Sequence, residues 1–119
     1  MKYGGRYFTA ADRKNDELLG YCGVVPQDRF LLLSKLYVHK DARGRGVVRA
    51  FLDEVNALCR MEYGFDKIRL TVNKGNDGAV VAYHKMGFET VGSVNTDIGG
   101  GFFMDDYVME LAVTDTEEL

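Results

Sequence analysis

The spacing of apolar and polar residues changes several times along the chain, and these changes divide it into short elements. Residues 6–10 and 18–25 are mostly apolar runs on either side of the polar stretch 12–17, a pattern typical of a β-hairpin. Residues 26–28 indicate the next turn. The long apolar run 30–38 then predicts a strand that is buried on both faces.

From Val47 onward, apolar residues recur every three or four positions, which predicts an amphipathic helix. Its apolar face consists of Val48, Phe51, Leu52, Val55, Leu58 and Cys59. Gly64 is a suitable end for this helix, because glycine readily adopts the left-handed conformation of a C-terminal cap. Residues 67–73 alternate in part and predict a strand. Residues 79–86 predict a short helix, which follows favoured N-cap residues and ends with Gly87 at C′.

Two further strands are predicted at residues 88–94 and 102–112, with the glycines at 99–101 between them. The centre of the chain therefore has the order strand, glycine-rich turn, helix, strand. This order is typical of a right-handed crossover between parallel strands, whereas the hairpins on either side are antiparallel. We expect an α/β (α+β) fold, with a mixed, mostly antiparallel sheet, a central parallel βαβ crossover and helices on its faces.

Composition limits the classes of protein that this chain fits. Its 119 residues are the size of one domain, so we expect residues 1–119 to form a single domain with a frayed tail at 114–119. The formal net charge of -3 gives no broad attraction to nucleic acid. No apolar run approaches the ~20 residues that span a bilayer, and the first residues lack the apolar core of a signal peptide. A cytoplasmic protein with buried, reduced Cys22 and Cys59 and no metal site is expected.

The segment Arg43-Gly44-Arg45-Gly46 lies between a predicted strand and a predicted helix, a place where anions bind readily. The first N–H groups of a helix have no partner within it, and the helix dipole adds partial positive charge. Glycines let a phosphate approach the backbone, and arginines add charge. No GxxxxGK[ST] string of a P-loop occurs, and Arg49 stands where a dinucleotide fingerprint needs its third glycine. A coenzyme A pyrophosphate site and a solvated basic turn both remain.

Two segments together resemble the signatures of the GNAT family of N-acetyltransferases. Residues 36–47 (LYVHKDARGRGV) resemble the R/Q-x-x-G-x-G/A turn after a strand that ends in valine. Residues 76–88 (NDGAVVAYHKMGF) resemble the second signature, N-x-x-A-[IV]-x-x-Y-x-K-x-G-F. Both occur in the family's order, with a helix and a strand between them, and the resemblance covers roughly residues 18–111.

This resemblance implies an acetyl-CoA-dependent N-acetyltransferase that moves an acetyl group to a primary amine by direct attack. The strand with Leu36, Tyr37 and Val38 would pair with the pantetheine arm, in a gap between diverging parallel strands. Asn76 would hydrogen-bond the arm near its sulfur end, and Tyr83 would bind there and protonate the leaving thiolate. The pyrophosphate would be bound by Arg43, Gly44, Arg45, Gly46, Val47, Val48 and Arg49.

Two departures from the family pattern bear on this interpretation. Val48 stands where glycine or alanine is usual, and its β-branched side chain is bulkier beside the phosphates. The strand and two helices that usually precede the hairpin at residues 6–25 are not apparent, so we expect the acceptor site to need completion, for which a homodimer is one hypothesis. A non-catalytic CoA-binding or regulatory domain and a protein-interaction module are therefore alternatives.

The base and the acceptor site are predicted only as candidates. The family often has a carboxylate base on the strand before the glycine turn or on the next strand, but residues 30–38 and 67–73 hold none. His39, Asp105, Asp106 and water alone remain as candidates for the base. His39 is a candidate because the pKa of histidine suits proton transfer, although an exposed residue at the end of a strand is the simpler interpretation. Asp105 and Asp106 lie among aromatic residues and could bind a cationic amine, with a solvated strand end as the alternative. The acceptor itself, a small-molecule or protein amine, is not identified by the sequence.

Overall fold

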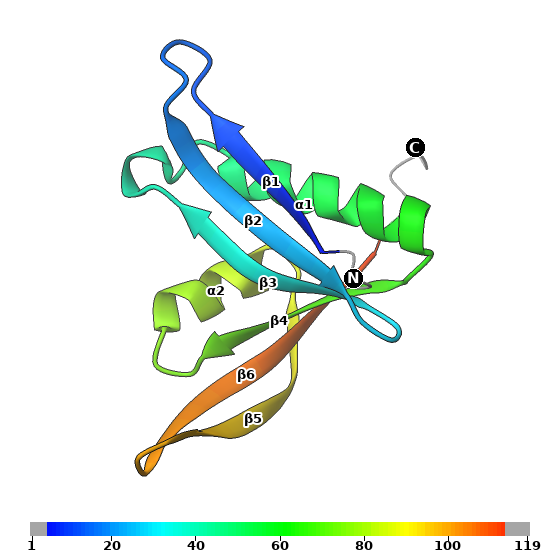
Figure 1. The fold of residues 1–119 in the computed structure, drawn as a ribbon, viewed down its shortest axis with the longest axis vertical. Helices are drawn as coiled ribbons and strands as arrows, with labels where there is room; N and C mark the ends of the chain where they lie inside the picture. Colours follow the sequence, from blue (N-terminus) through cyan, green and yellow to red (C-terminus); the bar gives the residue numbers. More distant parts are fainter. Residues whose placement is uncertain (1–4, 114–119) are drawn as a thin grey trace.

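The computed structural model describes residues 5–113, which form a six-stranded sheet and two α-helices. In chain order the elements are β1 (Arg6–Ala11), β2 (Leu18–Pro26), β3 (Leu31–Val38), α1 (Val47–Leu58), β4 (Lys67–Asn73), α2 (Asp77–Lys85), β5 (Glu89–Gly99) and β6 (Phe102–Ala112). The strand order across the sheet is β1-β2-β3-β4-β6-β5. Figure 1 shows this arrangement. The tail predicted at residues 114–119 lies outside the described part of the chain.

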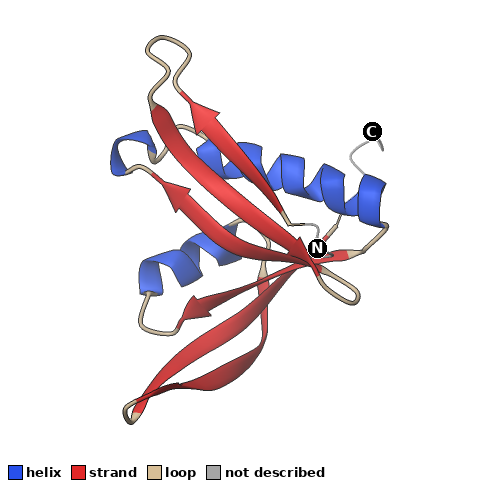
Figure 2. Cartoon of the chain, viewed as in Figure 1, coloured by secondary structure: helices blue, strands red, loops and turns tan. Residues whose placement is uncertain are grey.

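The pairing of the strands confirms the predicted fold class. Every neighbouring pair is antiparallel except β3 and β4, which are parallel. The connection from β3 to β4 passes through α1, and the connection from β4 to β5 passes through α2 (Figure 2). The sheet is therefore mixed and mostly antiparallel, with the central parallel βαβ crossover that the sequence predicts.

Both α-helices pack against the same face of the sheet. A Cβ added at Gly20 of β2 would lie 3.5 Å from the ring of Phe51 in α1. Cys22 lies two residues farther along β2, on the same face, and is near enough to Tyr83 of α2 to affect its pKa. Two right-handed crossovers that run in the same direction across a sheet produce this arrangement. The apolar core lies here, and both cysteines are buried in it as free thiols, as expected.

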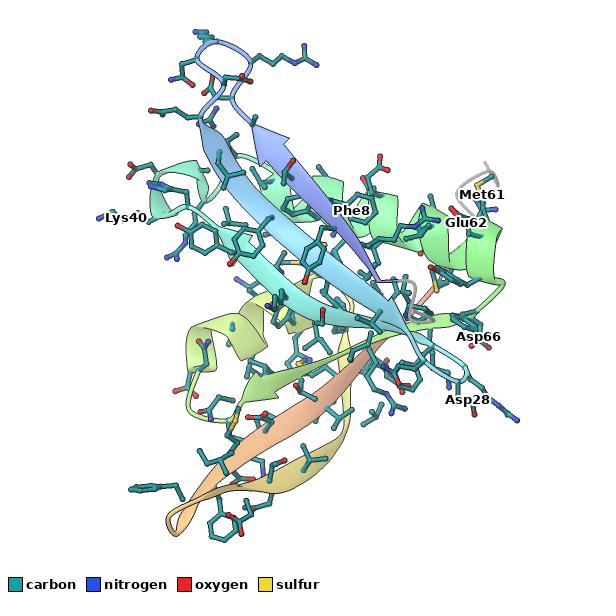
Figure 3. All side chains as sticks on the ribbon, in the orientation of Figure 1. Phe8, Asp28, Lys40, Met61, Glu62 and Asp66 are labelled. Carbon is teal, nitrogen blue, oxygen red and sulfur yellow. The ribbon has the colours of Figure 1, made fainter. Side chains whose placement is uncertain are left out.

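The long helix α1 has the predicted apolar face and the predicted end. Its buried residues are Val47, Phe51, Leu52, Val55, Asn56 and Leu58. It begins after Gly46 and continues through the π-helical turn η2 (Cys59–Tyr63) to Gly64, and both glycines have left-handed backbone conformations. An ion pair of 2.7 Å between Arg6 and Glu62 joins the end of the helix to β1, in the region where Figure 3 labels Glu62 and Phe8.

The opposite face of β1, β2 and β3 is open, and no helix of the described residues covers it. Tyr21 and Tyr37 stack there with 5.4 Å between ring centroids, and they remain 37% and 41% exposed. Ser34 and Lys35 are exposed as well. The prediction that residues 30–38 are buried on both faces is therefore wrong. An apolar run shows that a strand can be covered, but the cover has to come from other elements.

The hairpin of β5 and β6 is longer than the sequence predicts. The strand expected at residues 88–94 continues to Gly99, because β5 stays paired with β6 up to the turn at glycines 99–101. Every residue of β5 is exposed, so no burial pattern marks where the strand ends. In Figure 1 this hairpin and the β1–β2 hairpin extend from opposite ends of the molecule. None of the described helices is long and apolar enough to cross a membrane.

Candidate functional site

A cleft opens where the two parallel strands β3 and β4 separate. They pair only at Leu31 with Ile68 and at Leu32 with Arg69, near the start of each strand. A β-bulge lies just beyond, at Ser34 of β3, whose hydroxyl donates a 3.1 Å hydrogen bond to the carbonyl of Gly23. A bulge bends its strand and re-aims the residues after it, so this one accounts for the divergence that the family resemblance implies.

The cleft consists of two adjoining cavities. One has a volume of about 490 Å³ and the other about 260 Å³, and they share the lining residues Leu36, Asn76, Ala79 and Tyr83. The larger cavity also reaches Tyr37, Val38, Arg43 and Val48, so it runs from β3 to the start of α1. Residues from both separated sequence motifs thus line one site, because the cleft lies between β3 and the N-terminal ends of both helices.

The glycine turn before α1 is shaped to receive an anion. Gly44 and Gly46 have φ angles of 83° and 82°, and a Cβ at either position would meet no atom within 4 Å. The helix starts at Gly46 without a side-chain cap. The N–H groups of Val47, Val48 and Arg49 belong to the first turn, where the helix itself supplies no acceptors. With the partial positive charge of the helix start, these donors suit a phosphate group.

The three predicted arginines differ in their surroundings. Arg43 lines the larger cavity. Arg45 instead forms a 3.4 Å ion pair with Asp12 of the β1–β2 hairpin, which lies beside a different cavity. The backbone N–H of Lys14, together with Arg45, holds the pKa of Asp12 below its ordinary value. Arg49 is exposed on the first turn of α1. Arg43 is therefore the arginine whose position suits a ligand in the cleft.

Asn76 and Val48 line the cleft at the starts of the two helices. The Asn76 side-chain oxygen accepts a 3.2 Å hydrogen bond from the N–H of Ala79 and so caps α2. Its amide nitrogen is then the group suited to donate to a ligand. Val48 is half-buried against the core and contributes its side chain to the cavity wall. The departure from the family pattern thus lies inside the cleft.

Tyr83 lines both cavities from the middle of α2. Its ring packs edge-on against Phe88, with 5.5 Å between centroids. Burial raises the pKa of the Tyr83 phenol, and the nearby Cys22 raises it further. The phenol therefore keeps its proton at neutral pH and can donate it to a nearby anion.

The acidic and basic candidates do not gather at one point. His39 accepts a hydrogen bond from the N–H of Asp41 and lines a separate cavity, beside the turn where Figure 3 labels Lys40. Asp105 is exposed and forms a 3.1 Å ion pair with Lys74, whereas Asp106 is buried. Within residues 5–113, no group of three or more His, Cys, Asp and Glu side chains is placed to hold a metal ion.

Sequence reasoning missed three polar residues of the cleft. Ser34, Thr71 and Asn73 line the smaller cavity, and Ser34 also forms the bulge. The polar pair Ser34 and Lys35 inside an otherwise apolar run was a usable sign of an interrupted strand. Thr71 and Asn73 alternate with Leu70 and Val72, so they had to face away from the core.

Comparison with known proteins gives one family and several solved structures. A family model described as an acetyltransferase (GNAT) domain matches residues 1–110. No curated protein matches the chain. A crystal structure of nourseothricin acetyltransferase is similar with a TM-score of 0.82 and 27% identity, over 92% of this chain and 66% of that one.

Structures of a spermidine N-acetyltransferase from Vibrio cholerae are similar in fold. The form in complex with manganese ions gives a TM-score of 0.72 at 20% identity, over 91% of this chain and 65% of that one. A chimera of that enzyme and hSSAT gives a TM-score of 0.73 at 20% identity, over 91% of this chain and 67% of the chimera. The chain thus spans about two thirds of the length of these structures.

Proposed function

Because the chain belongs to the GNAT acetyltransferase family, we propose that it is an acetyl-CoA-dependent N-acetyltransferase that moves an acetyl group to a primary amine by direct attack. The observation that carries this proposal is the position of Tyr83, whose half-buried side chain lines both cavities of the cleft between β3 and β4. An amine acceptor also agrees with the similar solved structures, which are those of a nourseothricin acetyltransferase and a spermidine/spermine N-acetyltransferase.

The residues of the cleft fit the two chemically different ends of coenzyme A. Backbone N–H groups at Gly46, Val47 and Val48, together with the guanidinium of Arg43, would bind the pyrophosphate. The strand edge at Leu36–Val38 no longer pairs with β4, so its backbone groups can hydrogen-bond the amides of the pantetheine arm. The Asn76 amide would donate to the same arm farther along the cleft.

Bound acetyl-CoA would supply a thioester whose carbonyl carbon bonds to the acceptor nitrogen while the carbon–sulfur bond breaks. Tyr83 holds a proton on its phenol oxygen and donates it to the departing sulfur, which would otherwise leave as an anion. The raised pKa of Tyr83 keeps that proton in place until the sulfur carries negative charge. The proton lost by the attacking amine restores the phenol through solvent, so charge and protons balance.

Calorimetric titration of the chain with acetyl-CoA tests the first part of the proposal, with NADH and ATP as controls. We expect selective binding of acetyl-CoA, followed by turnover of at least some members of a panel of primary amines. Binding of NADH or ATP with equal affinity would contradict the assignment of the cleft. If acetyl-CoA does not bind at all, the two motifs do not form a working site in this chain.

One observation favours a second candidate function. Val48 narrows the cleft beside the glycine turn, where the family usually has glycine or alanine. A chain that binds the coenzyme with shifted phosphates could serve as a non-catalytic CoA-binding or regulatory domain. Two results together would support that alternative. The chain would bind acetyl-CoA tightly, and it would neither acetylate any amine nor hydrolyse the thioester.

A further inference from the structure

One carboxylate oxygen of Asp106, the Oδ1 atom, is buried without a hydrogen-bond donor among the described residues. Its residue is 8% exposed, and no group among residues 5–113 hydrogen-bonds to its Oδ1 atom. The adjacent Asp105 differs in both exposure and pairing, because its side chain is 53% exposed and forms an ion pair with Lys74. Burying a carboxylate without donors costs folding free energy, so such a group in a native protein calls for an explanation outside stability.

The register of the sheet places Asp106 one strand away from the cleft, although Asp106 itself lines neither of the two cavities. Asp106 of β6 lies directly across from Asn73 of β4 and from Val94 of β5. Opposed residues of an antiparallel pair share a face, so Asp106 lies on the face of Asn73 and Thr71. Those two residues line the smaller cavity together with Tyr83. Asp106 is therefore one strand away from the cavity that holds the proposed proton donor, on the face away from the helices.

The cations of the neighbouring strands do not neutralise this carboxylate. Arg69 forms its ion pair with Glu110, and both residues lie four positions along their strands from the opposed pair Asn73 and Asp106. Lys74 pairs with Asp105, whose side chain is on the opposite face. Lys35, on the other wall of the smaller cavity, forms no ion pair with Asp106. A positive charge brought by a ligand would supply what this part of the chain lacks.

We propose that Asp106 binds an ammonium group of the acceptor, and that the preferred acceptors are therefore amines with a second positive charge. This inference rests on the proposed acetyltransferase function. The nitrogen that attacks a thioester must be neutral, because it needs a free lone pair. A buried carboxylate favours a charged nitrogen, because an ammonium offers three N–H donors and the opposite charge. Anchoring and attack are thus assigned to two different nitrogens of one molecule.

The test is calorimetric binding of 1,4-diaminobutane and of butylamine to the whole chain and to two isosteric variants. For the wild type we expect binding of the diamine about tenfold tighter than that of the monoamine. Asp106→Asn should remove this preference by weakening diamine binding about tenfold. Asp105→Asn is the matched control and should leave both affinities within about threefold, because its carboxylate is already exposed and paired.

Equal binding of the two amines by the wild type overturns the inference, and so does an unchanged preference in Asp106→Asn or an equal loss in Asp105→Asn. Thermal unfolding shows whether Asp106→Asn is folded, and we expect it to be at least as stable as the wild type because a buried charge is removed. A loss of stability in Asp106→Asn would instead give Asp106 a structural role.

A parallel titration with acetyl-CoA separates this inference from the proposed function. Binding of acetyl-CoA without a preference for the diamine overturns this inference alone. A preference for the diamine without binding of acetyl-CoA overturns the proposed function alone.

Discussion

Tyr83 combines two properties that are seldom found together in a tyrosine of the core. Its ring packs on Phe88 and contributes to the apolar interior, while its phenol borders both cavities of the cleft. On helix spacing alone, a core tyrosine would be the better interpretation of this residue. The family motif in the sequence and the cleft in the structure are the two observations that favour our proposal of a proton donor over a packing residue.

Tyr83→Phe should lower kcat by about 100-fold while the affinity for acetyl-CoA stays within about threefold, because only the proton donor is removed. No described residue hydrogen-bonds to the Tyr83 hydroxyl, so the phenylalanine leaves no partner without its bond. Steady-state kinetics with an accepted amine and calorimetry with acetyl-CoA measure the two quantities. A parallel loss of turnover and of affinity would show that Tyr83 acts through packing.

Burial raises the pKa of the Cys22 thiol from 9.0 to about 11. Between those two pH values the unfolded chain loses a proton that the native protein retains, so the free energy of unfolding decreases as pH rises. The contribution of this group is fully present below pH 9 and is lost as pH approaches 11. Urea unfolding at several pH values should therefore show that the wild type loses more stability with rising pH than Cys22→Ala does.

Val24→Ala is the control for this pH series, since Val24 is buried on the same strand but has no group that titrates. It should lower stability by about 1 kcal/mol or more at every pH, through the lost methyl groups, with the wild-type dependence on pH unchanged. Parallel curves for the wild type and Cys22→Ala would contradict the raised pKa of the thiol.

At the scale of elements, the turn between β3 and α1 is the segment that we propose binds the pyrophosphate. Gly46 serves both as the start of α1 and as a residue with open space beside its Cα. These two roles can be separated by substitution. An alanine there tests the left-handed backbone alone, whereas an aspartate adds a negative charge where the pyrophosphate is proposed to lie.

Gly46→Asp should abolish detectable binding of coenzyme A, since two like charges would meet at the helix start. Gly46→Ala should weaken binding far less, although both substitutions cost about 1–2 kcal/mol of stability for a left-handed residue with a Cβ. Calorimetry with coenzyme A and thermal unfolding of both variants measure these effects. Binding by the aspartate variant at wild-type strength would show that the phosphates lie elsewhere.

The elements differ in how well the sequence predicts them. The two helices are predicted well, since α1 has a strong apolar period and α2 lies between its Asn76 cap and Gly87. The length of β5 is not predicted well, because every residue of this hairpin strand is exposed and no burial pattern marks its end. The contrast between Asp105 and Asp106 could not be predicted either. It depends on which face each residue takes in the β4–β6 ladder, and a shift of one position would exchange them.

At the scale of the whole molecule, the sheet consists of two parts with a narrow connection. β1, β2 and β3 form one part, and β4, β6 and β5 form the other. The two parts of the sheet are joined by backbone pairing at only two residue pairs of β3 and β4. Elsewhere the two parts are joined through the apolar core beneath the helices. A ligand in the cleft would contact both parts, so its binding free energy should add directly to the stability of their association.

Hydrogen exchange with and without coenzyme A tests this idea of a ligand that joins two half-sheets. At a ligand concentration 100 times Kd, binding should raise the free energy of unfolding by about 2.7 kcal/mol. We expect the largest gain in amide protection in the second half of β3, at the start of α1 and around Asn76, because these segments border the cleft. The tip of the β5–β6 hairpin is exposed, extends away from both helices in Figure 1 and lines neither cavity, so it should change least and serves as an internal control. Uniform protection across the chain would mean that the ligand slows global unfolding without closing the cleft, whereas protection concentrated at the hairpin tip would place the ligand outside the divergence of β3 and β4.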